Sequence, residues 1–529
     1  MAHPMILIIG AGPVGLTLAL ALHHAGVPAN TILIVDQRLE HTPSTLVKAL
    51  SMNASSLEIF RILGIVERIL PAGVPLHNAH FGSGRRLLDL NYEVLGTTYP
   101  FNYAIPQPRT EQILLTRCEE VGVQFVWGRR LTDLRDVQGT AVVATLQKVD
   151  GAPGETETIT APWLIGCDGT RSAVREALGI SWTGMAATRY CWVADVSMDP
   201  IAPGILTGID EGGKTLFYSL APGKARVSGN IPPSKVVPGQ RPTPPDVQWV
   251  REWAKEAVRR DLVVRDIEWS AVIGNGMRTA GTLRAGRVFI AGDAAHSLFP
   301  AGGQGMNTGL LDVANLSWKL AMVATGKITS QDVVERVLDS YSSERKPAIE
   351  AVVKNVRVQM SSMFSKTENE QAVADFIAEA FDQPAFNRLW ATRVAGFGDP
   401  TEPYQHVLQA KDELVGTRLT HVADTDAGDL LQAASNNTFI LAAVRCGNDE
   451  PVDFGWAKDL IAKHKGQFKP LDTPLEVTDH QKWAGVQALL LRPDLRIAWV
   501  SREGGRLTER LEGLSSTLSW WCGEPSTQT

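Results

Sequence analysis

The sequence MILIIGAGPVG at residues 5–15 decides the fold. Its apolar first half predicts a strand, and the spacing GxGxxG that follows is typical of a strand-to-helix turn. Gly10 allows the tight turn, Gly12 lets a pyrophosphate approach the backbone, and Gly15 lets the helix pack on the strand. The start of that helix adds free N–H groups and partial positive charge for phosphates. The stretch therefore predicts a dinucleotide site.

An acidic residue stands where such a site needs one. The β-branched stretch 32–35 predicts a second strand, and it ends at Asp36, 21 residues after Gly15. A carboxylate there accepts hydrogen bonds from ribose hydroxyls. Strand, helix and acid together favour dinucleotide binding over an ordinary glycine-rich turn.

Two further glycine turns follow apolar strands. GCDG at residues 166–169 ends the predicted strand 163–165, and GDAAH at 292–296 follows the predicted strand 288–291. After Pro300, the sequence GGQGMN opens a long helix whose free N–H groups suit an anion. Each turn alone is common, and their order after the first motif makes them informative.

Length, composition and charge exclude several classes of protein. A chain of 529 residues predicts two or three domains, because a single core stops growing at roughly 250–300 residues. With 51 basic and 57 acidic residues, nothing favours nucleic acid or a membrane surface as a partner. No run of about 20 apolar residues predicts a membrane span. The N-terminal apolar run lacks the basic segment of a signal peptide and is interrupted by glycines.

The cysteines are far apart in the sequence. No CxxC exists, and His and Cys do not cluster at metal-ligand spacing, so we expect no disulfide framework, no metal site and no dithiol redox centre. Reduced thiols fit a cytoplasmic protein. The five are Cys118, Cys167, Cys191, Cys446 and Cys522.

The order of the three glycine motifs resembles that of the single-component FAD-dependent aromatic hydroxylases, the flavoprotein monooxygenases similar to p-hydroxybenzoate hydroxylase and phenol hydroxylase. The resemblance covers about residues 5–350. The segment IPQPRTE at 105–111 is similar to the family segment before a flavin-contacting helix. The family often carries an Arg before its Thr-Leu-Glu, and this chain has Ser55 there. Residues beyond about 413 resemble the thioredoxin-like third domain of the phenol hydroxylase branch.

The resemblance implies a fold that combines α/β and α+β parts. A Rossmann-like FAD-binding domain is interleaved with a β-sheet substrate domain, and a thioredoxin-like domain without CxxC follows. The expected FAD-binding domain comprises 1–75, 105–184 and 276–360. The expected substrate domain comprises 76–104 and 185–275, and a helical segment and linker, 361–412, leads to the third domain at 413–529.

The resemblance also implies roles for single residues near a non-covalent FAD, and none for a metal. Asp36 binds the adenosine ribose and Arg38 covers the adenine. Asp293 bonds the ribityl or diphosphate part, and the N–H groups of Gly305 and Met306 face the flavin C2 carbonyl. The full cofactor set is Gly10, Gly12, Gly15, Asp36, Arg38, Arg109, Asp168, Asp293, Pro300, Gly305 and Met306.

The reaction that the family implies is a hydroxylation. NADPH or NADH binds transiently and reduces FAD, oxygen forms a flavin C4a-hydroperoxide, and a phenolic or polyketide-like aromatic substrate receives one oxygen atom. A Baeyer–Villiger or epoxidising member of the family stays open. So does a flavin-binding regulatory scaffold without catalysis. A homodimer is a further open alternative, with the C-terminal domain as a structural or dimer contact.

A hydroxylated aromatic substrate needs a group that accepts its proton or bonds its oxygen. The strand 216–220 alternates, so Tyr218 shares one face with Leu216 and Leu220. The resemblance implies that this face looks into the pocket beside Phe299–Pro300, and we therefore take Tyr218 as the catalytic candidate. Tyr103, His80 and His77 are alternatives. The resemblance implies a structural role for His296, which would bond local backbone. Tyr190 and Trp192 are expected either to line the pocket or to belong to the core.

Overall fold

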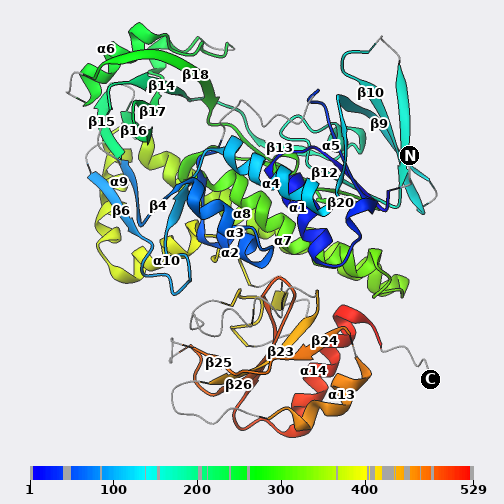
Figure 1. Ribbon diagram of the computed structural model, residues 1–529. Helices are drawn as coiled ribbons and strands as arrows, with labels where there is room; N and C mark the ends of the chain where they lie inside the picture. Colours follow the sequence, from blue (N-terminus) through cyan, green and yellow to red (C-terminus); the bar gives the residue numbers. More distant parts are fainter. Residues whose placement is uncertain are drawn as a thin grey trace.

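The computed structural model (Figure 1) has a mixed α/β architecture. It describes residues 4–39, 49–83, 86–137, 139–151, 155–200, 205–210, 213–237, 240–258, 262–364, 367–401, 404–405, 412–419, 430, 434, 437–445, 453–464, 466–477 and 482–524. Within these ranges no helix is both long and apolar enough to cross a membrane.

A six-stranded sheet organises the first part of the chain. Its order is β20-β21-β12-β1-β2-β8, and all neighbours are parallel except β20 and β21. Parallel neighbours end at the same edge of a sheet, so the residues that follow these strands gather there. The strands are β1 (Ile6–Ile9), β2 (Ile32–Asp36), β8 (Gln124–Trp127), β12 (Trp163–Gly166), β20 (Arg284–Ala285) and β21 (Val288–Ile290).

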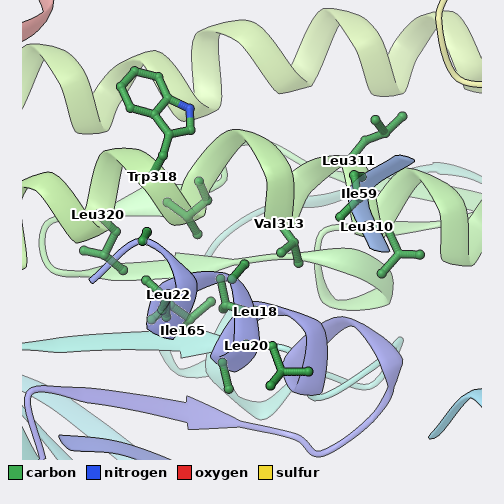
Figure 2. Close-up of a cluster of buried hydrophobic side chains, with 14 of the residues drawn as sticks. Leu18, Leu20, Leu22, Ile59, Ile165, Leu310, Leu311, Val313, Trp318 and Leu320 are labelled. Carbon is green, nitrogen blue, oxygen red and sulfur yellow. The ribbon is translucent and has the colours of Figure 1, made fainter. Parts of the chain in front are cut away.

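One helix packs on this sheet, and a second packs on the first. Helix α1 (Pro13–His24) is apolar almost all round, and it lies against α7 (Gln304–Ala324), as Figure 2 shows. Leu18 and Leu22 of α1 and Leu310 of α7 are fully buried in the same core. Each such side chain contributes about 1.5–3 kcal/mol when it leaves water. This contact fixes the start of α7 relative to the first glycine turn.

Helices and small sheets surround this core. The long helix α8 (Gln331–Met363) runs along α7, and α4 (Gln107–Val121) packs on α1. The remaining helices of this part are α2 (Ala54–Ile62), α3 (Val66–Ile69), α5 (Ala173–Ala177), α9 (Glu368–Phe381) and α10 (Pro384–Val394). The small sheets comprise β3 (Ser51–Met52), β4 (Val74–Leu76) and β7 (Asn102–Ala104); β5 (Asn78–Ser83) and β6 (Arg86–Asn91); β9 (Arg129–Val137), β10 (Ala141–Lys148) and β11 (Thr156–Ala161); and β13 (Trp182–Met185), β19 (Met277–Ala280) and β22 (His296–Ser297).

An antiparallel sheet of five strands lies beside the parallel one, with the order β15-β16-β17-β14-β18 (Figure 1). Helix α6 (Val247–Val258) covers one face, where Trp192 and Trp253 are buried. On the opposite face Cys191 packs with Phe299, which follows the GDAAH turn. The strands are β14 (Tyr190–Met198), β15 (Ile205–Asp210), β16 (Gly213–Ala221), β17 (Lys224–Asn230) and β18 (Val264–Gly274).

The C-terminal part forms a separate sheet below α7 and α8 (Figure 1). Its order is β24-β23-β26-β27, and β25 pairs with β23. Phe439 and Trp521 pack against Trp318 of α7, so the two parts share apolar core. The elements are β23 (Phe439–Arg445), α13 (Lys458–Lys463), β24 (Phe468–Pro470), β25 (Leu475–Glu476), β26 (Val486–Leu491), β27 (Ile497–Arg502) and α14 (Leu507–Cys522).

Candidate functional site

The edge of the parallel sheet brings the predicted motifs together. Asp36 ends β2, Gly10 follows β1, Asp168 comes after β12, and Asp293 comes after β21. These four strands are neighbours in the order β21-β12-β1-β2. The glycine turns after β1 and β21, whose Gly10 and Gly292 are 282 residues apart in the sequence, therefore lie on one continuous rim.

The first turn has the geometry that its glycines predict. Gly10 has φ +109°, and a Cβ there would lie 2.3 Å from the Cys167 carbonyl oxygen. A Cβ on Gly15 would lie 2.0 Å from the Gly10 carbonyl oxygen. At Gly12 a Cβ would meet no atom within 4 Å among those described, so this side of the backbone is open. Gly10 and Gly15 are required by packing, whereas Gly12 leaves room for a ligand.

The start of α7 offers a second open helix N-terminus. Gly303 caps it with φ +65° and without a side chain to bond the first amides. A Cβ on Gly305 would meet no described atom within 4 Å, and Met306 beside it is half-buried. Helix α1 is likewise preceded by Gly12, which has no capping side chain. Both helix starts thus present backbone N–H groups toward an anion.

Asp36 is held by its own local network. Its Oδ2 accepts the Ala11 amide at 2.7 Å, and its Oδ1 accepts the Arg38 Nε at 3.1 Å. Arg38 also bonds Glu111 of α4 at 3.1 Å. Burial opposes the Arg38 charge, but the carboxylates of Asp36 and Glu111 outweigh it and raise the pKa of Arg38. The acid and the arginine that the sequence predicted therefore lie in direct contact.

Asp168 has one oxygen engaged and one without a partner. Its Oδ2 accepts the Val174 amide at 3.1 Å and so caps the start of α5. Its Oδ1 is buried with no hydrogen-bond partner among the described residues. Burial raises the pKa of this carboxyl group. The orphaned oxygen marks Asp168 as a place where a ligand hydroxyl or N–H would be accepted.

The other predicted cofactor residues differ in exposure. Asp293 is half-buried, and its Oδ2 accepts the Thr170 hydroxyl at 3.4 Å. Pro300 is exposed, just before the turn that leads into α7. Arg109 is exposed in the first turn of α4. Asp293 and Pro300 thus lie on the segment between β21 and α7, whereas Arg109 comes from a separate element.

Two of the residues that we considered for bonding the substrate, Tyr103 and His77, are described by the structure. Tyr103 is part of the core. Its hydroxyl donates to the Leu70 carbonyl at 2.5 Å and accepts the Gly73 amide at 3.0 Å. His77 is exposed and lies 3.6 Å from Glu93. These bonds give Tyr103 a structural role.

Two other substrate-side candidates, Tyr218 and His80, have side chains outside the described part of the structure. The backbone of Tyr218 pairs with Arg226 of β17. Trp192, which we considered as pocket wall, lies under α6 with its ring centroid 4.6 Å from that of Trp253. It is therefore core of the antiparallel sheet.

His296 has a different partner from the one we predicted. Its Nε2–H donates to Oδ2 of Asp312 at 2.7 Å instead of bonding local backbone, so that prediction was wrong. The same oxygen accepts the Gly292 amide at 3.0 Å, and the other oxygen accepts Arg345 Nε at 2.9 Å. Burial alone would raise the pKa of Asp312, but the interactions with His296 and Arg345 outweigh it and lower the pKa.

Sequence reasoning missed two buried ion pairs near the site. One is the pair Asp312–Arg345. The feature of the sequence that could have indicated it is a single acid, Asp312, within an otherwise apolar stretch of helix. The other joins Asp195 of β14 to Arg226 of β17 through two bonds of 2.7 and 2.9 Å. A charged residue in the middle of each strand was its signal. The register places this pair on the same face as Cys191, the face opposite α6.

The residues at the rim fit FAD. Two helix starts without side-chain caps suit its phosphates and the anionic reduced ring, and the open backbone at Gly12 and Gly305 leaves space for both. The partnerless oxygen of Asp168 and the carboxylate of Asp36 are acceptors for hydroxyl groups. A dinucleotide with phosphates, ribose and a polar ring needs these groups.

Comparison with known proteins agrees with this geometry. Residues 4–356 match the family described as "FAD binding domain". The uncharacterized aromatic compound monooxygenase YhjG of Bacillus subtilis is 30% identical over 508 residues, 93% of each chain. A rifampicin monooxygenase of Rhodococcus hoagii is 30% identical over 98% of each chain. The anhydrotetracycline hydroxylase OxyS of Streptomyces rimosus superimposes with a TM-score of 0.78 at 26% identity, over 98% of this chain and 99% of that one.

The chain belongs to this FAD-binding family, because the family model covers well over half of it. The two relatives named above extend over almost its whole length and are named as monooxygenases. The protein is therefore an FAD-dependent aromatic monooxygenase.

Proposed function

We propose that this monooxygenase hydroxylates a phenolic, polyketide-like aromatic compound that is larger than a simple phenol. One observation carries the proposal: the face of the antiparallel sheet opposite α6 packs on the turn that leads into α7. The residues there are mainly apolar and include Cys191, Met277, Phe299, Met360 and Phe364. OxyS, an anhydrotetracycline hydroxylase by its name, shares this fold over almost the whole chain.

FAD would lie along the rim of the parallel sheet. The backbone at Gly12 would approach the diphosphate. Asp36 would accept a hydrogen bond from a ribose hydroxyl, which would replace the weak 3.4 Å hydrogen bond that Asp36 now accepts from Arg38 Nη2. Asp293 would bond the ribityl or diphosphate part. When bound, FAD takes electrons from NADPH or NADH and delivers one atom of O₂ to the substrate. The amides of Gly305 and Met306 would stabilise negative charge that develops on the ring.

Loss of the Asp293 carboxylate tests this placement. We expect Asp293→Ala to purify with little or no FAD, while Asp150→Ala, an exposed acid in the turn after β10, keeps full occupancy. Acid precipitation of the parent protein should release all the yellow colour, because the cofactor is not covalently attached. Full flavin content in Asp293→Ala would remove Asp293 from the site.

Tyr218 is our candidate for bonding the substrate phenol. Its backbone stands opposite Arg226, and the Asp195–Arg226 pair lies on the face toward Phe299. Directly paired residues share one face of a sheet. We expect Tyr218→Phe to lower kcat/KM, by about tenfold for each 1.4 kcal/mol lost, with unchanged FAD content. Unaltered kinetics on the true substrate would return Tyr218 to a structural role.

For the C-terminal unit we propose a thioredoxin-like arrangement without redox chemistry. In support, β23, α13 and β24 form a parallel β-α-β unit, and the antiparallel pair β26 and β27 with α14 completes it. The sequence contains no CxxC. We also propose a cytoplasmic location, since the four described cysteines are free. A homodimer stays a prediction, and light scattering of the purified protein would test it.

A further inference from the structure

Eight charged side chains are buried where the C-terminal unit, the part from β23 to α14, covers α7 and α8. Each of the eight is at most 7% exposed. They comprise four acids and four bases. The acids are Asp312, Glu344, Asp399 and Asp494, and the bases are Lys319, Arg345, Arg492 and Arg496.

Arg492 of the C-terminal unit neutralises an acid of α8. Its Nη1 and Nη2 bond the two carboxylate oxygens of Glu344 at 2.8 and 3.1 Å. Lys319 of α7 bonds the same carboxylate at 2.9 Å, and Asp494 bonds Arg492 Nε at 3.0 Å. Glu344 is fully buried, so without Arg492 it would keep a single cation. Arg492 of the C-terminal unit therefore adds a second cation to an acid that the flavin-binding part partners with Lys319.

Arg496 begins a chain of contacts that ends at the glycine turn after β21. It pairs with Asp399, whose Oδ2 also accepts Arg345 Nη1 at 3.0 Å. Arg345 Nε donates to Asp312 at 2.9 Å, and Asp312 accepts the Gly292 amide at 3.0 Å. Every side chain in this series of contacts is buried.

Arg345 also reaches the start of α7. Its Nη2 donates to the Thr308 carbonyl at 3.3 Å, two residues after Met306. The same guanidinium thus touches both segments that we place against FAD: the Gly292–Asp293 turn through Asp312, and the first turns of α7 directly.

We propose that the C-terminal unit positions the flavin site, with Arg496 as the positioning residue that holds Arg345 on Asp312, through Asp399, and thereby fixes the Gly292 turn. The inference rests on the proposed placement of FAD at this turn. The physical reason is that a buried ion with a missing partner is strongly unfavourable. If Arg496 is lost, Asp399 draws Arg345 or water toward itself, and Asp312 loses its orientation. This gives the C-terminal unit a role that needs no thiol.

The test uses the full chain with three variants. Arg496→Met removes the first contact, Arg496→Lys restores the charge, and Arg336→Met is the matched control. Arg336 also joins α8 to the C-terminal unit, but through the Trp520 carbonyl at 2.7 Å, nine residues before Arg345. FAD affinity of each apoprotein is measured by titration. Hydrogen exchange of the peptide that contains Gly292 reports on the turn.

We expect Arg496→Met to weaken FAD binding by about tenfold and to speed exchange at the Gly292 amide, a size typical of coupling between sites. Arg496→Lys should show a smaller change in the same direction. Arg336→Met should lower thermal stability without changing FAD affinity. If Arg496→Met does not fold, Arg496→Lys decides the matter, and unchanged affinity and exchange in it overturn the proposal.

Two outcomes separate this inference from the proposed site. If Asp293→Ala loses FAD while Arg496→Met binds it like the parent, the site stands and the coupling is wrong. If Asp293→Ala keeps FAD, the placement of the cofactor itself is wrong. Equal loss of affinity in Arg336→Met and Arg496→Met would mean that any weakening of the interface acts on FAD, which also overturns the specific chain of contacts.

Discussion

The two ends of the flavin rim use the same kind of ion pair in opposite surroundings. At the β21 end, Asp312 and Arg345 are 0% and 1% exposed, and Asp312 receives three donors. At the β2 end, Asp36 and Arg38 are 11% and 24% exposed. The Asp312–Arg345 pair belongs to a buried network that extends to the C-terminal unit, whereas the Asp36–Arg38 pair is partly exposed to solvent.

This difference separates scaffold from binding surface. Breaking a buried pair costs about 3–5 kcal/mol because a charge is left without water or partner. A solvent-exposed pair contributes about 0.2–1 kcal/mol, and we take this range as the guide for the more exposed Asp36–Arg38 pair. The β21 end is thus fixed before FAD arrives, whereas Arg38 can release Asp36 at little cost when a ribose binds. Stability and FAD affinity should therefore respond differently at the two ends.

The largest effect is expected for Asp312→Asn. The variant leaves Arg345 with one carboxylate fewer and weakens the bonds to His296 and the Gly292 amide. We expect the free energy of unfolding of the apoprotein to fall by about 3–5 kcal/mol, measured by urea denaturation. A loss below about 1 kcal/mol would show that this end is no more rigid than the Asp36 end.

Acid should weaken the same buried network. Burial opposes ionisation of Glu344, but Arg492 and Lys319 outweigh it and lower its pKa to about 2 from the ordinary 4.5. Because the folded pKa is lower, the stabilisation is complete above pH 4.5 and is lost as the pH falls toward 2. We expect a loss of about 3 kcal/mol over this range.

Denaturation of the parent protein and Glu344→Gln across this pH range isolates the contribution of one carboxylate. The difference in stability between the two proteins should shrink as the pH falls, because the neutral amide does not titrate. A difference that stays constant with pH would contradict the assignment of the lowered pKa to Glu344.

A smaller change in stability is expected at the other end. Asp36→Asn should alter the free energy of unfolding of the apoprotein by no more than about 1 kcal/mol. FAD affinity should nevertheless fall by about tenfold or more, since a hydrogen bond to a charged acceptor contributes about 1.5–3 kcal/mol. Titration of apoprotein with FAD, beside urea denaturation, measures both. Unchanged affinity would remove Asp36 from the ribose site.

The smallest effect is expected at the cysteines of the C-terminal unit. Burial raises the pKa of the Cys522 thiol to about 12, so it is un-ionised near neutral pH and a poor nucleophile. Cys522→Ser should keep kcat per bound FAD unchanged. Cys446→Ser should do the same, although Cys446 lies outside the described residues. Lost turnover in either variant would give this unit a redox role after all.

The sequence predicts the part of the site that is local. Gly10 and Gly15 are identifiable because a tight turn and close helix packing leave only glycine, and both restrictions act within a few residues. Asp36 and Asp293 are predictable for the same reason, since each ends or follows an apolar run. The mixed α/β architecture follows from the alternation of those runs with helical stretches, and the structure confirms it.

Long-range pairing escapes this reasoning. Asp312 and Arg345 are 33 residues apart, and Glu344 and Arg492 are 148 apart. The local sequence pattern does not distinguish a charged residue that will be buried from one that stays in water. The difference depends on a partner of opposite charge that only the folded structure places beside it. The error on His296 has the same origin, because its acceptor comes from α7 and not from the turn in which it lies.

Transfer of oxygen from O₂ to a phenolic ring tests the central claim most directly. The purified protein would be mixed with NADPH, isotopically labelled O₂ and a panel of polycyclic phenols, and the products analysed by mass spectrometry. We predict that at least one phenol accelerates NADPH oxidation and gains a hydroxyl group that carries the label. NADPH oxidation that yields only hydrogen peroxide across the panel, or conversion of a substrate without incorporated label, would contradict the assignment of this chain as a hydroxylase of large phenols.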